Sequence, residues 1–402
     1  MRKTLLFWES NTTGSGAEFL RATLALGWQP HLLCADPGLY TDVPTETAIT
    51  RLDSSADEQQ VEALLRQIAP HGILTTSNHF VTQSARSARR LGLAGPDPDA
   101  LARCIDKHQQ RMHLLEAGIP QPAFRYCRNE AEAVAAAAGL GYPVIVKPLS
   151  GSGKVGVSLA EDESRLRSWG RPLLTSASNE RGQAIPPGIL VEAYFAGREF
   201  SIECFHGSPV AVCEKQCSPP HFVEANHVTP PIDLHNRSLA LLQQLARDAL
   251  RALGLTWGAA HVEVRMNANG ELALVEVNPR LAGGNIPLLV TAATGVNLIR
   301  CSLEASVGMP VDLKPTLRRA AAIAFLFARE EGELRGIAGL DESRRLPGVR
   351  LVRAYPRRSS TIRLKNDFRD RIAYVIAEHA EPERAFATAV EAASYLQPEI
   401  EP

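Results

Sequence analysis

The 402-residue sequence lacks the features that mark several special classes of protein. Basic and acidic residues nearly balance, 43 against 44, so the net charge of −1 gives no electrostatic reason to expect nucleic acid or an anionic membrane as a partner. Aromatic residues make up only 6% and no basic motif is present, which also argues against nucleic-acid binding. No apolar run approaches the ~20 residues that cross a bilayer, and the apolar stretch at the N-terminus is too short for a signal peptide.

Paired cysteines are lacking as well. The seven cysteines are scattered, form no CxxC and cannot all pair, which suits a reducing compartment, so we expect a cytoplasmic protein. Cys213, Cys217, His221 and His227 lie close together in sequence and could bind zinc. Their spacing matches no standard finger pattern. We therefore favour loop residues near a substrate over a zinc site.

What the sequence does contain is the alternation of strands and helices that is typical of a parallel α/β sheet. The expected elements of the first hundred residues are strands at 3–7, 29–35 and 72–76 and helices at 17–26 and 84–91. A polar loop, residues 10–16, follows the first strand where such sheets bind ligands, although a plain connecting turn fits equally well. The length predicts two to three domains. Pro96 and Pro98 mark the first boundary, and a single helix at 100–117 follows.

Residues 144–157, VIVKPLSGSGKVGV, contain a GxGxxG and a GK pair. A P-loop needs glycine and Ser or Thr where this sequence has Pro148 and Val155. A dinucleotide fingerprint needs a helix after its glycines, but residues 157–160 read as a second strand. The remaining interpretations are a flap between two strands, whose backbone N–H groups close over phosphates, or an ordinary glycine-rich hairpin.

Residues 260–280 predict a hairpin with acidic residues on one face. Asn269-Gly270 is the preferred centre of a two-residue type I′ turn. That turn places Glu263 opposite Glu276, with Leu274 and Asn278 on the same face and Val275 on the other. Two carboxylates ~5 Å apart repel each other, and divalent cations such as Mg²⁺ would relieve that repulsion. The alternative is a solvent-exposed face that tolerates two acids.

The order of these motifs resembles the ATP-grasp superfamily. The matching segments are Asp106-Lys107, Val146-Lys147-Pro148 before the flap, residues 191–200, and Glu276-Val277-Asn278-Pro279-Arg280. The resemblance implies an α/β and α+β fold in three parts. These are an N-terminal Rossmann-like parallel sheet domain (1–100), ATP-grasp nucleotide-binding domains (101–312, with a flap subdomain at about 121–195), and a small C-terminal α/β domain packed on the core (313–402).

The resemblance also implies a role for each matching residue. The residues expected to contact the nucleotide are Lys107, Lys147, Gly151, Ser152, Gly153, Gly156, Glu192, Ala193, Tyr194, Phe195, Glu199 and Lys215. Lys107 and Lys147 would contact phosphates, the glycines would form the flap, residues 192–195 would hold adenine, Glu199 the ribose and Lys215 the γ-phosphate. Two Mg²⁺ ions, for which Mn²⁺ can substitute, would bind Glu263, Glu276 and Asn278.

Three further segments resemble the bacterial L-amino-acid ligase branch: residues 319–326, 346–349 and the loop 222–227. By this resemblance Glu224 and His227 would lie near a substrate ammonium group. Arg280, a catalytic residue with Lys215, would hold a carboxylate or an acylphosphate. Gly283 and Gly284 would also border the substrate, leaving room for one larger than alanine, although a tight phosphate-contacting turn explains them equally well.

The implied function is a carboxylate–amine ligase that forms an amide or peptide bond through an acylphosphate and releases ADP and phosphate. Its partners would be a small-molecule acid and amine, and the superfamily suggests a homodimer. Two alternatives stay open: a biotin-carboxylase-like enzyme that activates bicarbonate, and a non-catalytic ATP-binding scaffold.

Overall fold

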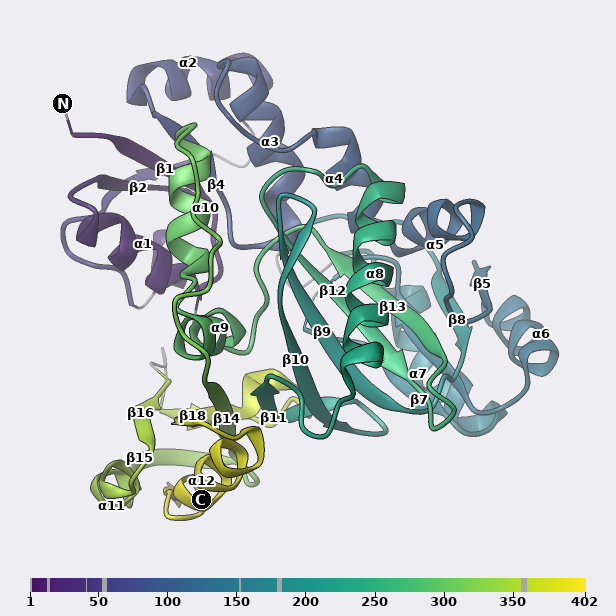
Figure 1. The fold of residues 1–402 in the computed structure, drawn as a ribbon. Coiled ribbons are helices and arrows are strands. Elements are labelled where there is room, and N and C mark those ends of the chain that lie inside the picture. The colour runs from purple at the N-terminus through teal and green to yellow at the C-terminus, as the bar shows by residue number, and fades with distance from the viewer. Residues whose placement is uncertain are drawn as a thin grey trace.

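The computed structural model describes residues 2–12, 15–40, 42–52, 56–151, 153–178, 183–355 and 360–402. The chain begins with a four-stranded parallel sheet in the order β3-β2-β1-β4. The elements of this region are β1 (Thr4–Trp8), α1 (Ser15–Ala25), β2 (Gln29–Cys34), β3 (Ala48–Arg51), α2 (Glu58–Ile68), β4 (Gly72–Leu74) and α3 (Val81–Arg90). Leu5, Leu6 and Phe7 of β1 are all fully buried, as expected for a parallel strand covered on both faces. The expected Rossmann-like sheet is confirmed (Figure 1).

The predicted single helix at 100–117 is wrong, because two helices occupy this segment. Helix α4 (Pro98–Ile105) ends at Asp106, which has extended backbone angles, and α5 (Lys107–Glu116) begins directly after it. The Asp106 carboxylate accepts hydrogen bonds from the backbone N–H groups of His108 and Gln109 at 2.8 and 3.0 Å, which caps the new helix. The break places Lys107 in the first turn of α5.

The flap subdomain is an antiparallel sheet in the order β5-β8-β6-β7 with two helices on one face. Its elements are β5 (Phe124–Cys127), α6 (Glu130–Leu140), β6 (Val144–Pro148), β7 (Ser158–Ala160), α7 (Glu163–Thr175) and β8 (Ile189–Ala193). Val144 and Val146 point into the helical core, whereas Ile145 and Lys147 line a cleft on the other face. The glycine-rich turn therefore joins two paired strands, as predicted.

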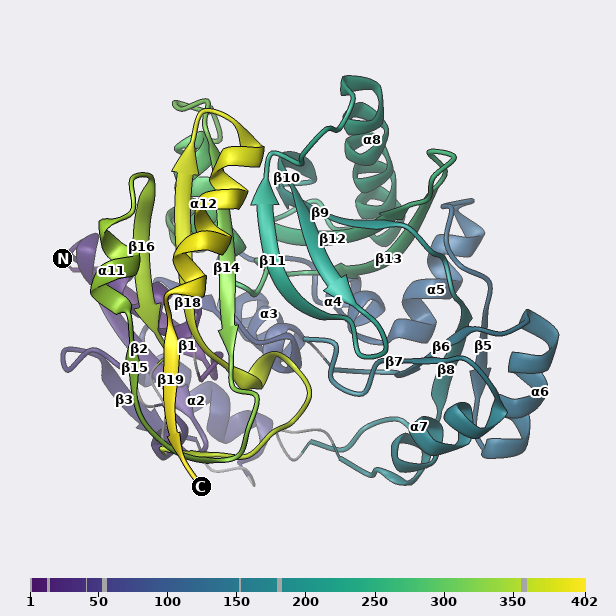
Figure 2. The same cartoon turned by 90° about the horizontal axis from the view of Figure 1, so that it is seen from below.

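A single eight-stranded sheet forms the centre, in the order β13-β12-β9-β10-β11-β14-β18-β16. Its strands are β9 (Arg198–Phe205), β10 (Ser208–Ser218), β11 (Val223–Thr229), β12 (Ala259–Met266), β13 (Leu272–Asn278), β14 (Ala320–Phe327), β16 (Val349–Ala354) and β18 (Arg371–His379). Strands β11 and β14 pair directly, so the sheet continues from the nucleotide-binding region into the C-terminal region (Figure 2).

Helices and a second small sheet cover this centre. Helix α8 (Asn236–Leu253) packs on β9 and β12, and α12 (Pro382–Ser394) packs on β14 and β18. The remaining elements are α9 (Ile286–Thr294), α10 (Leu298–Ser306), α11 (Leu340–Arg345) and the sheet of β15 (Gly332–Ala338), β17 (Thr361–Ile362) and β19 (Gln397–Glu401). Within the described ranges no single helix is long and apolar enough to cross a membrane, and one bent pair, α9 with α10, passes on length and composition.

The hairpin of β12 and β13 pairs Glu263 with Glu276 as predicted, but its turn and its register differ from the prediction. The turn is longer than a two-residue turn, because the Asn267 N–H donates to the Glu271 carbonyl at 3.0 Å. The register then shifts beyond Glu263, where Val264 pairs with Leu274, so Val275 is an extra residue in β13. The longer turn reverses the predicted face of Leu274, which enters the core. The bulge residue Val275 lines the cleft and restores the predicted pairing at Glu263 and Glu276.

Candidate active site

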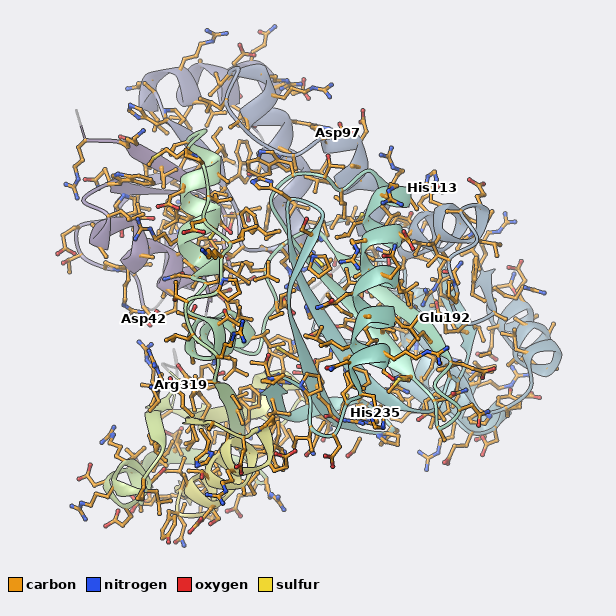
Figure 3. The ribbon with its side chains drawn as sticks, viewed as in Figure 1. Asp42, Asp97, His113, Glu192, His235 and Arg319 are labelled. Atoms are coloured by element: carbon orange, nitrogen blue, oxygen red, sulfur yellow. The ribbon has the colours of Figure 1, made fainter. Side chains whose placement is uncertain are left out.

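A cleft of about 750 Å³ lies between the flap sheet and the central sheet. Eight of the twelve predicted nucleotide-binding residues line it: Lys107, Lys147, Gly151, Glu192, Ala193, Tyr194, Phe195 and Glu199. Two predicted metal ligands, Glu263 and Glu276, line it as well. The cleft is on the side of the molecule where Glu192 is labelled in Figure 3, far from Arg319 at the start of the C-terminal region. Ser152 falls outside the described residues, and Gly153 and Gly156 belong to the turn above the cleft.

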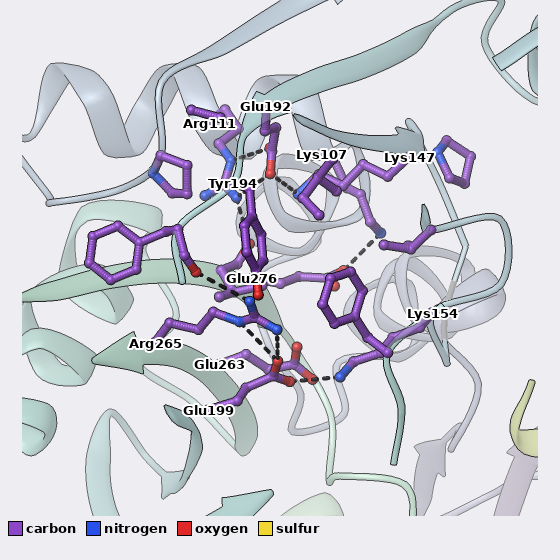
Figure 4. A pocket seen from close by; sticks show the side chains of 18 of the residues that line it. Lys107, Arg111, Lys147, Lys154, Glu192, Tyr194, Glu199, Glu263, Arg265 and Glu276 are labelled. Atoms are coloured by element: carbon purple, nitrogen blue, oxygen red, sulfur yellow. Dashed lines mark hydrogen bonds and ion pairs between the residues drawn. The ribbon is translucent and has the colours of Figure 1, made fainter. Parts of the chain in front are cut away.

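One wall of the cleft is a buried ionic network that sequence reasoning did not find. Arg111 on α5 donates from Nε and Nη2 to the two carboxylate oxygens of Glu192, at 2.7 and 3.1 Å, and Lys147 Nζ lies 2.7 Å from Glu192 Oε2 (Figure 4). Burial acts to raise the pKa of Glu192, but the positive charges of Arg111 and Lys147 outweigh it and lower that pKa to about 2. Burial, with Arg111 nearby, lowers the pKa of Lys147 to about 8.

Arg111 also holds the bulge of the hairpin. Its Nη1 and Nη2 donate to the carbonyls of Leu274 and Val275 at 3.0 and 2.7 Å. Gln110 exchanges two hydrogen bonds with the backbone of Val277, at 2.8 and 2.9 Å. Side chains of helix α5 therefore supply hydrogen-bond partners to backbone groups of β13, which is an edge strand of the sheet.

Lys107 connects the flap to the acidic hairpin. Its Nζ lies 2.8 Å from Glu276 Oε1 and donates to the Gly151 carbonyl at 3.2 Å. The predicted phosphate-binding lysine, the flap and a predicted metal ligand therefore meet at one point.

Lys215 lies at the centre of three carboxylates. Its fully buried ammonium is 2.9 Å from Glu199 Oε1, 3.1 Å from Glu224 Oε1 and 2.8 Å from Glu263 Oε1. Burial lowers the pKa of Lys215, but these carboxylates outweigh burial and hold that pKa well above its ordinary value. The oxygens of Glu199, Glu224 and Glu263 lie within 4.8 Å of one another, so this group provides a compact site for positive charge.

Lys154, from the GK pair of the flap, reaches the same group. Its Nζ lies 2.7 Å from Glu199 Oε1 and 3.6 Å from Glu224 Oε1. Arg265 also contacts Glu199, with Nη2 2.9 Å from Oε2. The guanidinium of Arg265 in turn lies against the rings of Tyr194 and Phe222. Sequence reasoning did not assign Lys154 a role, although its position in the glycine-rich turn could have identified it as a residue of the site.

The predicted metal ligands offer oxygens on one face, at the place where two parts of the chain meet. Asn78, the first residue of a short 3-10 helix after β4, donates from Nδ2 to Asn278 Oδ1 at 2.6 Å. The buried Oδ1 of Asn78 has no hydrogen-bond partner among the described residues. His261 bridges Glu203 and Glu263, at 2.7 and 3.0 Å. Carboxylate and amide oxygens with one buried acceptor left over fit a hard cation such as Mg²⁺.

The predicted substrate residues come together with a cation from the C-terminal region. Arg371 at the start of β18 donates from Nη2 to the Glu224 carbonyl and to Glu224 Oε2, at 2.8 and 3.2 Å, and its guanidinium lies 3.7 Å from the Phe325 ring centroid. His227 Nε2 is 3.7 Å from Glu224 Oε2, and neither ring nitrogen of His227 forms a hydrogen bond within the described chain. Burial lowers the pKa of His227 to about 3, so its ring is neutral.

Gly283 and Gly284 differ in the space around their Cα atoms. A Cβ at Gly283 would meet no atom within 4 Å, whereas one at Gly284 would lie 2.6 Å from His227 Nε2, and Gly284 has a φ of +59°. Arg280 lies two residues beyond β13 and lines a second cavity. Burial lowers the pKa of Arg280, and the charges of Glu276, Glu263, Glu203 and Glu224 act to raise it.

The four residues considered for zinc do not converge. Cys213 is fully buried among apolar side chains, and His221 pairs with Ser158 of the flap at 3.1 Å and lies edge-on to Trp169. Over the ranges that the structure covers, the only group of three or more His, Cys, Asp or Glu side chains arranged to hold an ion is Glu199, Glu224 and Glu263.

Comparisons with known proteins agree with this geometry. A family model described as "ATP-grasp domain" matches residues 140–287, and one described as "L-amino acid ligase C-terminal domain 2" matches residues 324–401. The chain is 32% identical over 386 residues to "Uncharacterized protein y4rH" of Sinorhizobium fredii, covering 94% of this chain and 79% of that protein. It is 27% identical to the alanine–anticapsin ligase of Bacillus amyloliquefaciens, covering 65% of this chain and 57% of that one.

Solved structures share the fold. An L-amino acid ligase from Bacillus licheniformis superposes with a TM-score of 0.82 at 22% identity, covering 100% of this chain and 99% of that one. A biotin carboxylase domain of the 2-oxoglutarate carboxylase from Hydrogenobacter thermophilus, solved with MgADP and bicarbonate, gives 0.76 at 17% identity and covers 100% and 91%. Because the two matching domains build the two sides of the site around Lys215, the protein belongs to the ATP-grasp family of carboxylate–amine ligases, close to the L-amino acid ligases.

Proposed function

We propose that this protein joins a small-molecule acid to an amine, forming an amide or peptide bond through an acylphosphate. The observation that carries the proposal is the group of Glu199, Glu224 and Glu263 around Lys215, because it joins the nucleotide cleft to the residues contributed by the C-terminal region. ATP-grasp enzymes in general use ATP with Mg²⁺. A site for phosphoryl transfer needs concentrated, well-positioned charge more than covalent chemistry from the protein.

The reaction has two balanced steps. A carboxylate oxygen of the acid attacks the γ-phosphorus of ATP, the bond to the bridging β,γ-oxygen breaks, and ADP leaves. The amine nitrogen then attacks the carbonyl carbon of the acylphosphate, the carbon–oxygen bond to phosphate breaks, and the nitrogen loses a proton. A closed flap excludes water, which would otherwise hydrolyse the acylphosphate.

The lysines of the cleft would exchange their present partners for phosphate. Lys107, Lys147 and Lys154 each contact a glutamate now, at 2.7 to 2.8 Å, so their ammonium groups already face the cavity. Lys215 would approach the γ-phosphate, and Arg280 the carboxylate or acylphosphate.

Glu263, Glu276 and Asn278 would hold two Mg²⁺ ions, with Mn²⁺ as a substitute. When bound, these ions would neutralise charge on the phosphates. The chain's own contribution is to hold the ligands: Asn78 orients Asn278, and His261 and Lys215 orient Glu263.

The amine would bind beside the C-terminal region. Glu224 would accept its ammonium protons, and the neutral His227 ring, which has an unused lone pair, would orient the nitrogen. An amino acid is the favoured amine because Arg371 lies on the same side and could hold a carboxylate. The names of the L-amino acid ligase and of alanine–anticapsin ligase support this choice.

The test is phosphate release from MgATP across a panel of acids and amines, singly and in pairs, with mass spectrometry of the products. We expect one pair to release phosphate and to yield a product of the summed mass minus water. Bicarbonate-dependent release without a condensed product would favour the carboxylase alternative. ATP binding without release would favour a scaffold.

Matched variants make that test specific. Glu276→Gln should abolish release, whereas Glu271→Gln, an exposed position near the turn of the same hairpin, should not. Size-exclusion chromatography with multi-angle light scattering checks the proposed homodimer. The molar mass of a monomer would contradict it.

A further inference from the structure

Two neighbouring strands of the central sheet carry buried polar side chains on the face that borders the cleft. In the register of β9 and β12 the facing pairs are Glu199 with Arg265, Ser201 with Glu263, and Glu203 with His261. The proposed reaction gives roles to Glu199 and Glu263 but none to Glu203, which is fully buried. A buried charge is unfavourable unless it is paired, so the contacts of Glu203 require a reason.

Glu203 has one hydrogen-bond partner among the residues that the structure describes. Its Oε1 lies 2.7 Å from Nδ1 of His261, whereas the buried Oε2 has no partner in those ranges. On its other side, β10 places Ala211 opposite Glu203, and an alanine side chain offers no donor. Burying a carboxylate with one oxygen unpaired costs free energy, so an uncharged side chain would serve folding better at this position.

His261 connects Glu203 to a predicted metal ligand. Its second ring nitrogen, Nε2, lies 3.0 Å from Glu263 Oε1. An ionised carboxylate only accepts hydrogen bonds, so the ring satisfies both carboxylates when each of its nitrogens carries a proton. Glu203 therefore fixes the orientation of the ring and balances its charge, as a carboxylate behind a histidine does in many metal sites.

The same contact decides which oxygen of Glu263 remains for a cation. Oε1 of Glu263 faces two donors, His261 Nε2 at 3.0 Å and Lys215 Nζ at 2.8 Å. Oε2 accepts no hydrogen bond within the described ranges, and Glu263 lines the cleft. If Lys215 moves to the γ-phosphate when nucleotide binds, His261 is the donor that stays on Oε1. Glu263 then offers one oxygen to an ion rather than two.

We propose that Glu203 is a positioning residue of the metal site: through His261 it keeps Oε1 of Glu263 engaged, so that Glu263 binds an ion through Oε2 alone. This rests on the metal ligands of the proposed ligase function and adds a residue that determines their selectivity. Binding through one oxygen suits Mg²⁺, which demands near-ideal octahedral geometry. The larger Ca²⁺ accepts more ligands and often takes both oxygens of a carboxylate. Glu203 and His261 together therefore favour Mg²⁺ over Ca²⁺.

The selectivity can be measured by calorimetry without turnover, with the full-length protein and the non-hydrolysable β,γ-imido analogue of ATP. The Kd of this nucleotide in excess Mg²⁺ is compared with its Kd in excess Ca²⁺. We expect the unchanged protein to bind the Mg²⁺ form at least tenfold more tightly. The absence of any preference would overturn the proposal.

Glu203→Gln should lower this preference about tenfold, because removing the partner of a residue that holds a metal ligand typically changes metal affinity by ~10–100-fold. Glu203→Asp should retain more of the preference than Glu203→Gln, since it keeps the negative charge. An unchanged ratio of the two Kd values in Glu203→Gln would overturn the proposal. If Glu203→Gln does not fold, His261→Gln carries the same expectation, and an unchanged ratio there would overturn the proposal equally.

A double variant tests whether Glu203 acts through His261. Adding Glu203→Gln to His261→Gln should change the ratio no further, because the residue that links Glu203 to Glu263 is already absent. The charge of Glu203 also acts on Arg280, and an effect exerted through Arg280 would persist in the His261→Gln background. Such persistence would contradict the proposed route.

Ser201→Ala is the matched control. Ser201 is fully buried on the same strand, lies opposite Glu263, and its Oγ has no hydrogen-bond partner among the described residues. A change there disturbs the packing beside Glu263 without touching His261, so the ratio should stay as in the unchanged protein. An equal loss of preference in Ser201→Ala would show that packing, and not Glu203, sets the selectivity.

The outcomes separate this inference from the ligase proposal. Condensed product from an acid and an amine, together with an unchanged ratio in Glu203→Gln, would leave the ligase proposal standing and overturn the role of Glu203. A lowered ratio in Glu203→Gln, without phosphate release from MgATP for any acid and amine, would support the role of Glu203 and contradict the ligase.

Discussion

Replacing Arg111 with leucine should be among the most damaging single changes in this protein. The side chain is nearly inaccessible, and its guanidinium contacts both oxygens of Glu192, the side chain of Gln121 and two backbone carbonyls of the β13 bulge. Arg111→Leu would leave Glu192 with Lys147 alone. It would also leave the carbonyls of Leu274 and Val275 to find water in a closed site.

The magnitude follows from Glu192. Its pKa falls from 4.5 to about 2 in the folded protein, so the carboxylate contributes stability that is present above pH 4.5 and is lost as pH falls through about 2. At about 1.4 kcal/mol per pKa unit this contribution is roughly 3 kcal/mol. Lys147 keeps part of it, and each unpaired carbonyl costs a further ~1–3 kcal/mol. We expect a net loss of about 3–5 kcal/mol, the range typical of breaking a buried ion pair.

The assay is thermal unfolding of the nucleotide-free protein near pH 7. For a cooperative unit the size of the whole chain the loss corresponds to a fall in Tm of about 4–6 °C. Arg125→Leu is the matched control, because Arg125 is exposed on β5 and, among the residues that the structure describes, its side chain bonds only the Phe124 carbonyl. Glu192→Gln combined with Arg111→Leu should cost less than the sum of the single changes, since the two side chains act as a pair. A Tm like that of the control, or strict additivity, would refute this reasoning.

Three other predictions follow from the cleft. Because the pKa of Lys147 is about 8, its ammonium loses its proton as pH rises above 8, and the Kd for MgADP measured by calorimetry should rise between pH 8 and 9.5, by up to about tenfold per pH unit. Gly153→Ala should raise the same Kd about tenfold, because Gly153 has a φ of +65° and its Cβ would lie 2.5 Å from the Phe368 ring. Glu276→Gln should raise the Mg²⁺ concentration needed for nucleotide binding at least tenfold, as measured by titration at fixed ADP.

Each of these predictions has its own control. A Kd that stays flat from pH 7 to 9.5 would show that Lys147 does not contact phosphate. Gly139→Ala, at an unobstructed position in helix α6, should leave the Kd unchanged, and an equal effect would contradict the flap argument. Glu271→Gln is the control for the magnesium titration and should leave the required Mg²⁺ concentration unchanged.

Parts of the site could be read from the sequence because their geometry is local. Lys147 follows three consecutive apolar residues in one strand, so the side of the sheet on which it lies follows from strand periodicity. Glu263 and Glu276 belong to one hairpin, and their pairing follows from a short connection. Even here the prediction of faces was wrong on the turn side of the pair, because the turn is longer than predicted. The extra residue Val275, held by Arg111 from another element, then restores the pair.

The boundary between α4 and α5 shows the limit of local reasoning. The apolar spacing of residues 100–117 suits one helix, yet Asp106 caps the next two N–H groups with its side chain and turns the chain. Aspartate competes with the helix by such bonds. Whether it wins depends on the packing of the two helices, which the pattern does not contain.

By itself the sequence determined the order of the motifs, the flap between two strands, the acidic face of the hairpin and hence the family. Only the tertiary structure decided which charges meet. Glu192 pairs with Arg111 from 81 positions away, Glu224 with Arg371 from 147, and Asn278 with Asn78 from 200. The reason is physical: periodicity fixes the direction of a side chain within its own element, whereas its partner depends on how elements pack, and burial then sets which of those pairs must form.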